Sequence, residues 1–357
     1  MINVTKSYLP QLDEYVHYLE GIWERVHLTN NGPLVRELEK QIKSYLGVDH
    51  LLFCSNGTIV LQMAIKALGL TKEIITTPFS YCASSHAILW ENCTPVFADV
   101  RPDDFTIDPE QIERLITPNT EAILATHVYG NPCQIEAIDA LARKHGLKVI
   151  YDGAHAFGAR YKGQSVLSYG DISTCSFHAT KVFHTVEGGL IVCNDPKLYE
   201  KLGLFRSFGH RFDDYFDVGI NAKNSELHAA MGLCNLPRVP DLIEARRQRF
   251  GLYDAQLDFS SLSRPVIQPE VEYNYAYYPI VFPTEAKLLE VKAALEAVQI
   301  FPRRYFYPSL NTLPFLKERQ SCPVSEDIAL RALCLPMYPD LEIEVIDQVC
   351  EIVNKVS

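Results

Sequence analysis

A carboxylate that ends an apolar run is the first candidate for chemistry. Asp152 closes the segment 148–152 and is followed by small residues up to position 159, which leave room for a planar group. An unpaired carboxylate in such surroundings is costly unless it meets a cation or a donor, and a protonated pyridine nitrogen would be such a partner. His155, three residues further on, could stack on a flat ring or hydrogen-bond to it. The alternative is an aspartate that only caps the following loop.

A lysine between two apolar segments is the second candidate. Lys181 lies in the stretch 173–193, next to Phe177, Val182 and Phe183. Apolar surroundings lower the pKa of an amine, which is what a lysine that forms a Schiff base requires. A solvent-facing turn lysine is the competing interpretation.

A third segment could hold a phosphate. Asn56, Gly57 and Thr58 open a helix directly after a strand, where glycine lets the backbone approach closely and free N–H groups favour an anion. Ser176 could offer its hydroxyl to the same phosphate as Thr58. An ordinary helix-capping turn is the alternative.

The elements that must position these side chains alternate between strand-like and helix-like segments. Expected strands are 51–54, 74–77, 95–98, 122–129, 148–152, 172–177 and 189–193, and expected helices are 58–68, 84–90, 108–115 and 135–145. Such alternation predicts an α/β fold with a mostly parallel sheet, helices on both faces and ligands at the carboxyl ends of the strands. Because only about a dozen residues join the last two strands, one antiparallel strand is expected.

Changes in this pattern divide the chain into three parts. Residues 1–30 predict an N-terminal helical arm, residues 31–240 a large domain, and residues 241–357 a smaller α/β domain. The last part contains an Arg-rich helix, aromatic strands and two further helices. No low-complexity linker separates the parts, so we expect them to pack together.

Composition and charge exclude several classes of protein. The chain of 357 residues is 47% hydrophobic and 22% charged, as in ordinary soluble globular proteins, and its net charge of −11 argues against a nucleic-acid or anionic-membrane binder. The ten cysteines show no CxxC spacing, which argues against a zinc site and favours buried thiols in a reducing compartment. Neither a signal peptide nor an apolar stretch of about 18 residues is visible, so we expect a cytoplasmic protein.

Taken together, the chemistry-bearing segments resemble the DegT/DnrJ/EryC1/StrS family of sugar aminotransferases. The matching motifs are D-G-A-H-A-F-G-A at 152–159, S-F-H-A-T-K at 176–181 with E-G-G at 187–189, N-G-T at 56–58 and G-x-N-x-K-x-S-E at 219–226. The resemblance extends from T-N-N-G-P at 29–33 to F-P-R-R-Y-F-Y-P-S-L at 301–310. It implies a fold-type-I pyridoxal phosphate enzyme, similar to aspartate aminotransferase, with a seven-stranded sheet and a small C-terminal domain.

The resemblance also implies roles for the matched residues. Lys181 would form the Schiff base with the cofactor and later shuttle the proton, and Asp152 would keep the pyridine nitrogen protonated. The phosphate would be held by Gly57, Thr58 and Ser176.

The remaining matches are looser. Tyr81 would lie against the ring face, with Phe79 as a rival because the P-F-S-Y segment is one residue short of the commonest version. His155 would lie near the cofactor's hydroxyl. Asn221 would reach the phosphate of the neighbouring subunit's cofactor, which implies a homodimer with shared active sites. Candidates for the nucleotide-sugar side are Lys223, Arg303 and Arg304, for which solvated surface charges are the alternative.

The activity implied by the resemblance is a transfer of the amino group of L-glutamate to a keto sugar. The wording around 219–226 and 304–308 looks most like enzymes that act on a dTDP-4-keto-6-deoxyhexose and give a dTDP-4-amino-4,6-dideoxyhexose for surface polysaccharide or O-antigen. The runner-up is a 3-keto substrate.

Three further functions compete with a sugar aminotransferase. They are an amino-acid aminotransferase, a sugar dehydratase, in which a His replaces the lysine, and a catalytically silent regulatory protein. Because Lys181 and Asp152 are both present, the last two are disfavoured.

Overall fold

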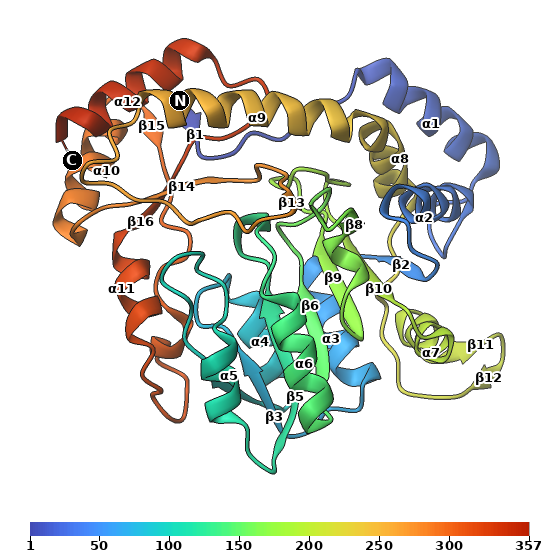
Figure 1. The fold of residues 1–357 in the computed structure, drawn as a ribbon. Helices are drawn as coiled ribbons and strands as arrows, with labels where there is room; N and C mark the ends of the chain where they lie inside the picture. The colour runs from blue at the N-terminus through green and yellow to red at the C-terminus, as the bar shows by residue number, and fades with distance from the viewer. Residues whose placement is uncertain (357) are drawn as a thin grey trace.

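The computed structural model describes residues 1–356, and a sheet of seven strands forms its centre (Figure 1). In spatial order the strands are β2 (Leu51–Cys54), β10 (Gly189–Cys193), β9 (Ile172–Ser176), β6 (Lys148–Asp152), β5 (Thr120–Thr126), β3 (Glu73–Thr76) and β4 (Thr94–Phe97).

The sheet is parallel except for one strand. β10 runs antiparallel to both of its neighbours, β2 and β9, whereas β9, β6, β5, β3 and β4 pair in parallel. The short connection before β10 allows a turn but no crossover helix. The expected α/β fold with a mixed, mostly parallel seven-stranded sheet is therefore confirmed.

Two apolar cores lie on opposite faces of this sheet, because side chains alternate along each strand. In β2, Leu51 and Phe53 belong to one core, and Leu52 and Cys54 to the other. The helices that contribute to the first core are α2 (Pro33–Leu46), α5 (Pro109–Leu115), α6 (Ile135–His145) and α8 (Glu226–Asn235). Those of the second are α3 (Gly57–Ala67), α4 (Ala83–Trp90) and α7 (Pro196–Arg206).

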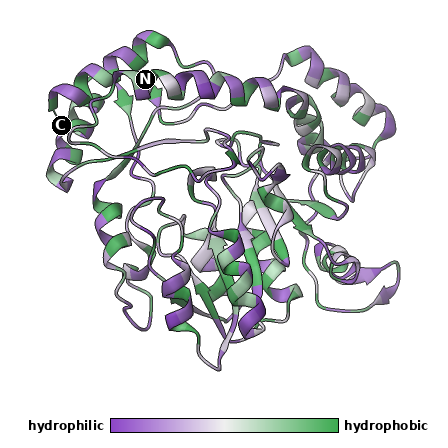
Figure 2. Ribbon diagram, viewed as in Figure 1, coloured by the Kyte–Doolittle hydropathy of each residue, from purple (hydrophilic) through white to green (hydrophobic). Residues whose placement is uncertain are grey.

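The covering helices are amphipathic where they meet solvent. In α2 the buried residues Val35, Leu38, Ile42 and Leu46 follow helical spacing, and the helix ends at Gly47 with the left-handed backbone that glycine adopts readily. In Figure 2 the central strands are green or pale, and the helices around them carry both green and purple.

A third apolar core lies in the C-terminal part of the chain, defined here as residues 257–356. The long helix α9 (Val239–Gln256) leads into it along the top of Figure 1. Its strands β14 (Tyr278–Val281) and β16 (Ala332–Leu335) pair antiparallel, and α10 (Glu285–Ala297) packs with α12 (Ile343–Val356).

The remaining elements are short or lie at the edges. The N-terminal helix α1 (Leu12–Arg25) packs on α8, and β1 (Ile2–Asn3) pairs with β15 (Ile300–Phe301) of the C-terminal part. The others are β7 (Arg160–Tyr161), β8 (Gln164–Ser165), β11 (His210–Arg211), β12 (Asp214–Tyr215), β13 (Val271–Glu272), α11 (Pro323–Arg331) and the 3-10 turns Val128–Gly130, Val166–Ser168, Leu236–Arg238 and Leu310–Thr312. Among residues 1–356, no helix combines the length and apolar character needed to cross a bilayer.

One expected strand is longer than the observed one. The apolar run 122–129 predicts a strand to its end, but β5 stops at Thr126. The chain then turns through the 3-10 turn Val128–Gly130, in which Tyr129 has a φ of 57° and a ψ of 9°. The run stays apolar because Val128 and Tyr129 are buried beneath the C-terminal part. Hydrophobicity alone does not distinguish such a buried turn from a strand.

Acid sensitivity follows from a buried histidine just beyond β5. His127 is inaccessible and stacks on Tyr151, and burial lowers its pKa from 6.5 to about 4. Between these two pH values the unfolded chain takes up a proton that the folded chain refuses, so the free energy of unfolding falls as the pH falls. The slope contributed by this side chain is at most about 1.4 kcal/mol per pH unit.

A non-titrating substitution tests this contribution. Asn in the variant His127→Asn can still accept the hydrogen bond that Cys133 N–H donates to Nδ1 over 3.1 Å. We expect a lower urea midpoint at pH 7, because the stacking on Tyr151 is lost, but a smaller loss of stability between pH 6.5 and 5 than in the parent protein. Equal pH slopes for the two proteins would contradict the assignment.

Candidate active site

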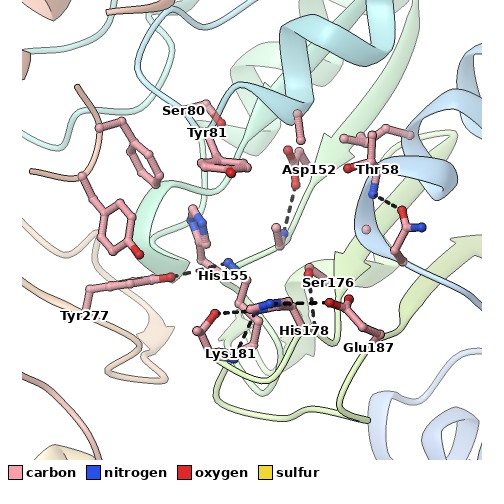
Figure 3. Close-up of a pocket in the computed structure, with 18 of the residues that line it drawn as sticks. Thr58, Ser80, Tyr81, Asp152, His155, Ser176, His178, Lys181, Glu187 and Tyr277 are labelled. Carbon is pink, nitrogen blue, oxygen red and sulfur yellow. Dashed lines mark hydrogen bonds and ion pairs between the residues drawn. The ribbon is translucent and has the colours of Figure 1, made fainter. Parts of the chain in front are cut away.

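A cavity of about 370 Å³ opens at the carboxyl edge of the central sheet. Its wall comes from the turns after β2 and β3, the segment after β6 and the end of β9, and the C-terminal part closes it with Tyr277, Arg303, Tyr305 and Phe306. Figure 3 shows the labelled side chains of this cavity pointing toward a common space. The motif-bearing segments of the sequence do not all meet here, since 219–226 lies outside the cavity wall.

Asp152 lines the cavity from the last position of β6. It is 4% exposed, and its carboxylate accepts hydrogen bonds from the hydroxyl of Ser84 (2.7 Å) and from the N–H of Ala154 (3.0 Å). Burial raises its pKa, although both hydrogen bonds and the nearby Lys181 favour the charged form. A carboxylate in this position attracts a cationic group that enters the cavity.

Lys181 enters the same cavity from the turn between β9 and β10. Its Nζ lies 3.5 Å from the hydroxyl oxygen of Tyr277, and burial lowers its pKa while Asp152 acts in the opposite direction. A larger fraction of the amine is therefore neutral, and so nucleophilic, than for a lysine in water.

A cluster of polar groups at the start of α3 faces the cavity from another side. The side chain of Asn56 caps the helix by accepting the N–H groups of Thr58 and Ile59 at 3.0 and 2.8 Å. The hydroxyls of Thr58 and Ser176 belong to the cavity wall beside Gly57. A Cβ on Gly57 would lie 2.8 Å from that of Ser176, so only glycine lets the start of α3 approach the end of β9 this closely. This arrangement suits an anion such as a phosphate.

An aromatic cluster borders the cavity on the side of the C-terminal part. His155 is buried, its ring lies 5.3 Å from that of Phe306 in a stacked orientation, and its Nδ1 accepts the N–H of Tyr129. Burial holds its pKa well below the usual range, so the ring is neutral. Of the two candidates for the ring face, Tyr81 is 57% exposed in the cavity wall, whereas Phe79 is buried in the cluster and does not reach the cavity.

The two neighbouring arginines have different surroundings. Arg303 lines the cavity, with its guanidinium 5.2 Å from the ring of Tyr305, and among residues 1–356 no carboxylate forms an ion pair with it. Arg304 lies outside the wall and donates to Glu285 over 2.7 Å and to the carbonyl of Leu330. Only Arg303 is thus available to an anion in the cavity.

Asn221 and Lys223 lie outside the cavity of their own chain. Nζ of Lys223 donates to Oδ1 of Asn221 over 2.8 Å and lies 4.7 Å from the ring centre of Phe208. Both residues follow the β11–β12 hairpin, which extends away from the body of the molecule (Figure 1).

Several residues of the cavity were not singled out from the sequence. Tyr277 contacts Lys181, and Nε2 of His178 lies 3.6 Å from the carboxylate of Glu187, while Ser84, behind the cavity wall, donates to Asp152. The sequence does show an aromatic run at 275–278 and a run of small, partly polar residues after Tyr81. Neither run indicates which of its residues faces a ligand.

The arrangement fits a flat, phosphorylated ring that is positively charged at one edge. The polar start of α3 can hold the phosphate, the buried carboxylate of Asp152 can hold the cationic edge, and the amine of Lys181 can react with a carbonyl on such a ring. The cavity therefore suits a carbonyl-bearing, phosphorylated cofactor.

Comparison with known proteins agrees with this chemistry. Residues 12–354 match the DegT/DnrJ/EryC1/StrS aminotransferase family. The chain is similar to the dTDP-4-amino-4,6-dideoxy-D-glucose transaminases of Shigella dysenteriae (40% identity, covering 100% of this chain and 99% of the relative) and Escherichia coli (38%, covering 98% and 97%). Among solved structures, DesI in the presence of its TDP-sugar product superposes with a TM-score of 0.94 at 31% identity, covering 99% of this chain and 92% of DesI.

Proposed function

The chain belongs to the DegT/DnrJ/EryC1/StrS aminotransferase family, and we propose that it transfers the amino group of L-glutamate to a dTDP-4-keto-6-deoxyhexose. The product would be a dTDP-4-amino-4,6-dideoxyhexose, a precursor for surface polysaccharide or O-antigen. The observation that carries the proposal is the meeting of the Lys181 amine, the Asp152 carboxylate and the hydroxyls of Thr58 and Ser176 in one cavity. The choice of sugar rests on the two relatives, which match along almost their whole length.

Pyridoxal phosphate is the cofactor that these residues fit. When bound, it supplies an aldehyde carbon that links to amines and a conjugated ring that takes up electron density. Thr58, Ser176 and the backbone at Gly57 would bind its phosphate, and Asp152 would keep a proton on the ring nitrogen. Tyr81 would lie against the ring face, and the neutral His155 would donate from Nε2 toward the ring hydroxyl.

Lys181 has two tasks in this proposal. Its Nζ would bind the cofactor through the aldehyde carbon, and the amine, once free, would carry a proton to and from the substrate carbon. The lowered pKa of Lys181 serves both tasks, because an amine must be unprotonated to attack and to accept a proton. Tyr277 lies near enough to hold the released amine in place.

Arg303 is the residue that we assign to an anionic substrate group. Glutamate carries carboxylates and the acceptor carries a diphosphate, so both substrates bring negative charge into the cavity. Apart from Asp152, the carboxylate in the cavity wall is that of Glu187, which faces His178. We favour the nucleotide-sugar side for Arg303, and assign no substrate contact to Arg304.

A second copy of the chain is part of the proposal. The β11–β12 hairpin exposes large apolar side chains, among them Phe212 at 96% and Tyr215 at 77% exposure, which is costly for a segment that stays in water. Asn221, at the base of this hairpin, is exposed and outside its own cavity. We infer that the hairpin lies against a partner chain in a homodimer, and that Asn221 contacts the phosphate in the partner's cavity.

The amino-transfer itself is tested by an absorbance spectrum. We expect the protein loaded with pyridoxal phosphate to show a yellow band that bleaches when L-glutamate is added and returns when dTDP-4-keto-6-deoxyglucose is added. Lys181→Ala should fold normally by circular dichroism but lose roughly 10²- to 10⁴-fold of the rate, because the proton-transferring amine is absent. Recovery with the 3-keto isomer alone would replace the proposed substrate, and a protein that never binds the cofactor would refute the proposal.

The assignment of Arg303 has a matched control in its neighbour. In Arg303→Gln we expect the KM for the keto-sugar nucleotide to rise about 10- to 100-fold, the usual effect of losing a hydrogen bond between charged groups. Arg304→Gln removes a guanidinium of the same type outside the cavity and should leave both KM values near those of the parent. If Arg303→Gln changed only the KM for glutamate, the arginine would serve the amino donor instead.

Shared active sites are tested by mixing inactive variants. Asn221→Asp places a negative charge against the partner's phosphate. When this variant is mixed with an equal amount of Lys181→Ala, about a quarter of all sites would combine an intact Lys181 from one chain with an intact Asn221 from the other. We expect activity to return to that level after subunit exchange. Thr58→Ala mixed with Lys181→Ala should give no recovery, because both residues belong to the cavity of one chain. Recovery in neither mixture would contradict the shared site.

A further inference from the structure

Tyr129 stands out because its backbone is strained and its side chain is fully enclosed. The residue is 1% exposed and has a φ of 57°, a region that bulky side chains rarely occupy. Such strain persists only where the surroundings hold the residue in place, and it is found preferentially at functional sites. Tyr129 does not line the cavity itself, so its contacts must explain the strain.

The contacts of Tyr129 join the central-sheet side of the cavity to the C-terminal part. Its hydroxyl donates to the carbonyl of Tyr305, and its own carbonyl accepts the hydroxyl of Tyr273 at 2.8 Å. Its ring stacks on Phe306 with the ring centres 5.7 Å apart. Two of these three contacts reach the segment 303–306, which contributes Arg303, Tyr305 and Phe306 to the cavity wall.

The backbone of Tyr129 contacts the other side of the cavity. Its N–H donates to Nδ1 of His155 over 3.3 Å, which leaves Nε2 of that neutral ring to bear the proton. His155 also stacks on Phe306, so Tyr129, Phe306 and His155 form a continuous aromatic stack. With this left-handed backbone, Tyr129 presents its N–H to His155 and its hydroxyl to Tyr305.

We propose that Tyr129 is a positioning residue that sets the segment 303–306 at the proper distance from the cofactor-facing His155. This inference rests on the proposed function, since it assigns the segment to recognition of the keto-sugar nucleotide. The hydroxyl fixes the backbone at Tyr305, and through it the direction of Arg303, whose own N–H and carbonyl are bound to Cys334. Tyr129 touches no reacting atom.

The competing explanation is a tyrosine that only stabilises the packing between the two parts. Tyr253 offers a matched comparison, because its hydroxyl also ends on a buried carbonyl, that of Pro336 in the C-terminal part at 3.0 Å, while its ring packs on Tyr278. Tyr129→Phe and Tyr253→Phe each remove one buried hydroxyl and leave one carbonyl without that donor. We expect only Tyr129→Phe to release the segment 303–306.

Hydrogen exchange in the protein without substrate provides the first measurement. In Tyr129→Phe we expect the peptide that covers 302–308 to exchange about 5- to 10-fold faster than in the parent protein, as for the loss of one hydrogen bond. In Tyr253→Phe that peptide should exchange at the parent rate. Equal acceleration in both variants, or in neither, would overturn the proposal in favour of general packing.

Kinetics and binding provide the second measurement. We expect Tyr129→Phe to raise the KM for dTDP-4-keto-6-deoxyglucose and the Kd for dTDP about 5- to 20-fold, while bleaching of the cofactor band by glutamate keeps its rate within about twofold. Tyr253→Phe should change none of these. An unchanged KM in Tyr129→Phe would refute the positioning role. If the parent protein failed to transaminate at all, the proposed function would fall, whereas the exchange data would still report on the segment.

Discussion

The burial of two opposite charges at one edge of the central sheet is the constraint on which the rest of the structure depends. Asp152 is nearly inaccessible and Lys181 shares its cavity, so burial disfavours the charged form of each while their attraction favours it. The hydroxyl of Ser84 and the N–H of Ala154 donate hydrogen bonds to the carboxylate of Asp152. A cationic ring can therefore approach Asp152 without a change in the fold, because a position that favours a positive charge already exists.

The carboxyl edge of the sheet brings together segments that are far apart in the chain. These segments can approach only where no side chain stands between their backbones. A Cβ on Gly189 would lie 2.2 Å from the carbonyl oxygen of Asn56, and one on Gly57 would collide with Ser176. The start of α3 and the beginning of β10 thus approach as backbone against backbone. The turn that leads into the antiparallel strand β10, which lies between β2 and β9, places Lys181 beside the polar cluster at the start of α3.

The sequence predicts the central sheet well because each strand is an apolar run bounded by turns, and the short connection before Gly189 dictates the one antiparallel strand. It predicts the cavity less completely. The apolar run through Tyr129 gives no sign that the chain turns after Thr126, since burial beneath a distant segment produces the same pattern as a strand. Likewise, the choice between Phe79 and Tyr81 depends on which ring meets the C-terminal part, and that contact is not local in sequence.

The pair Arg303–Arg304 shows most clearly what only the three-dimensional structure settles. Arg303 is bound to Cys334 through both its N–H and its carbonyl, and that carbonyl also accepts the N–H of Tyr305 at 3.0 Å, so the chain turns at Arg304. Arg303 faces the cavity and Arg304 faces Glu285. The groups that we assign to the cofactor all come from the central-sheet side, whereas the unpaired cation comes from the C-terminal part. In a ping-pong reaction both substrates would use one cavity in turn, and in our proposal the C-terminal part would contact the substrates while Lys181 carries out the same chemistry on each.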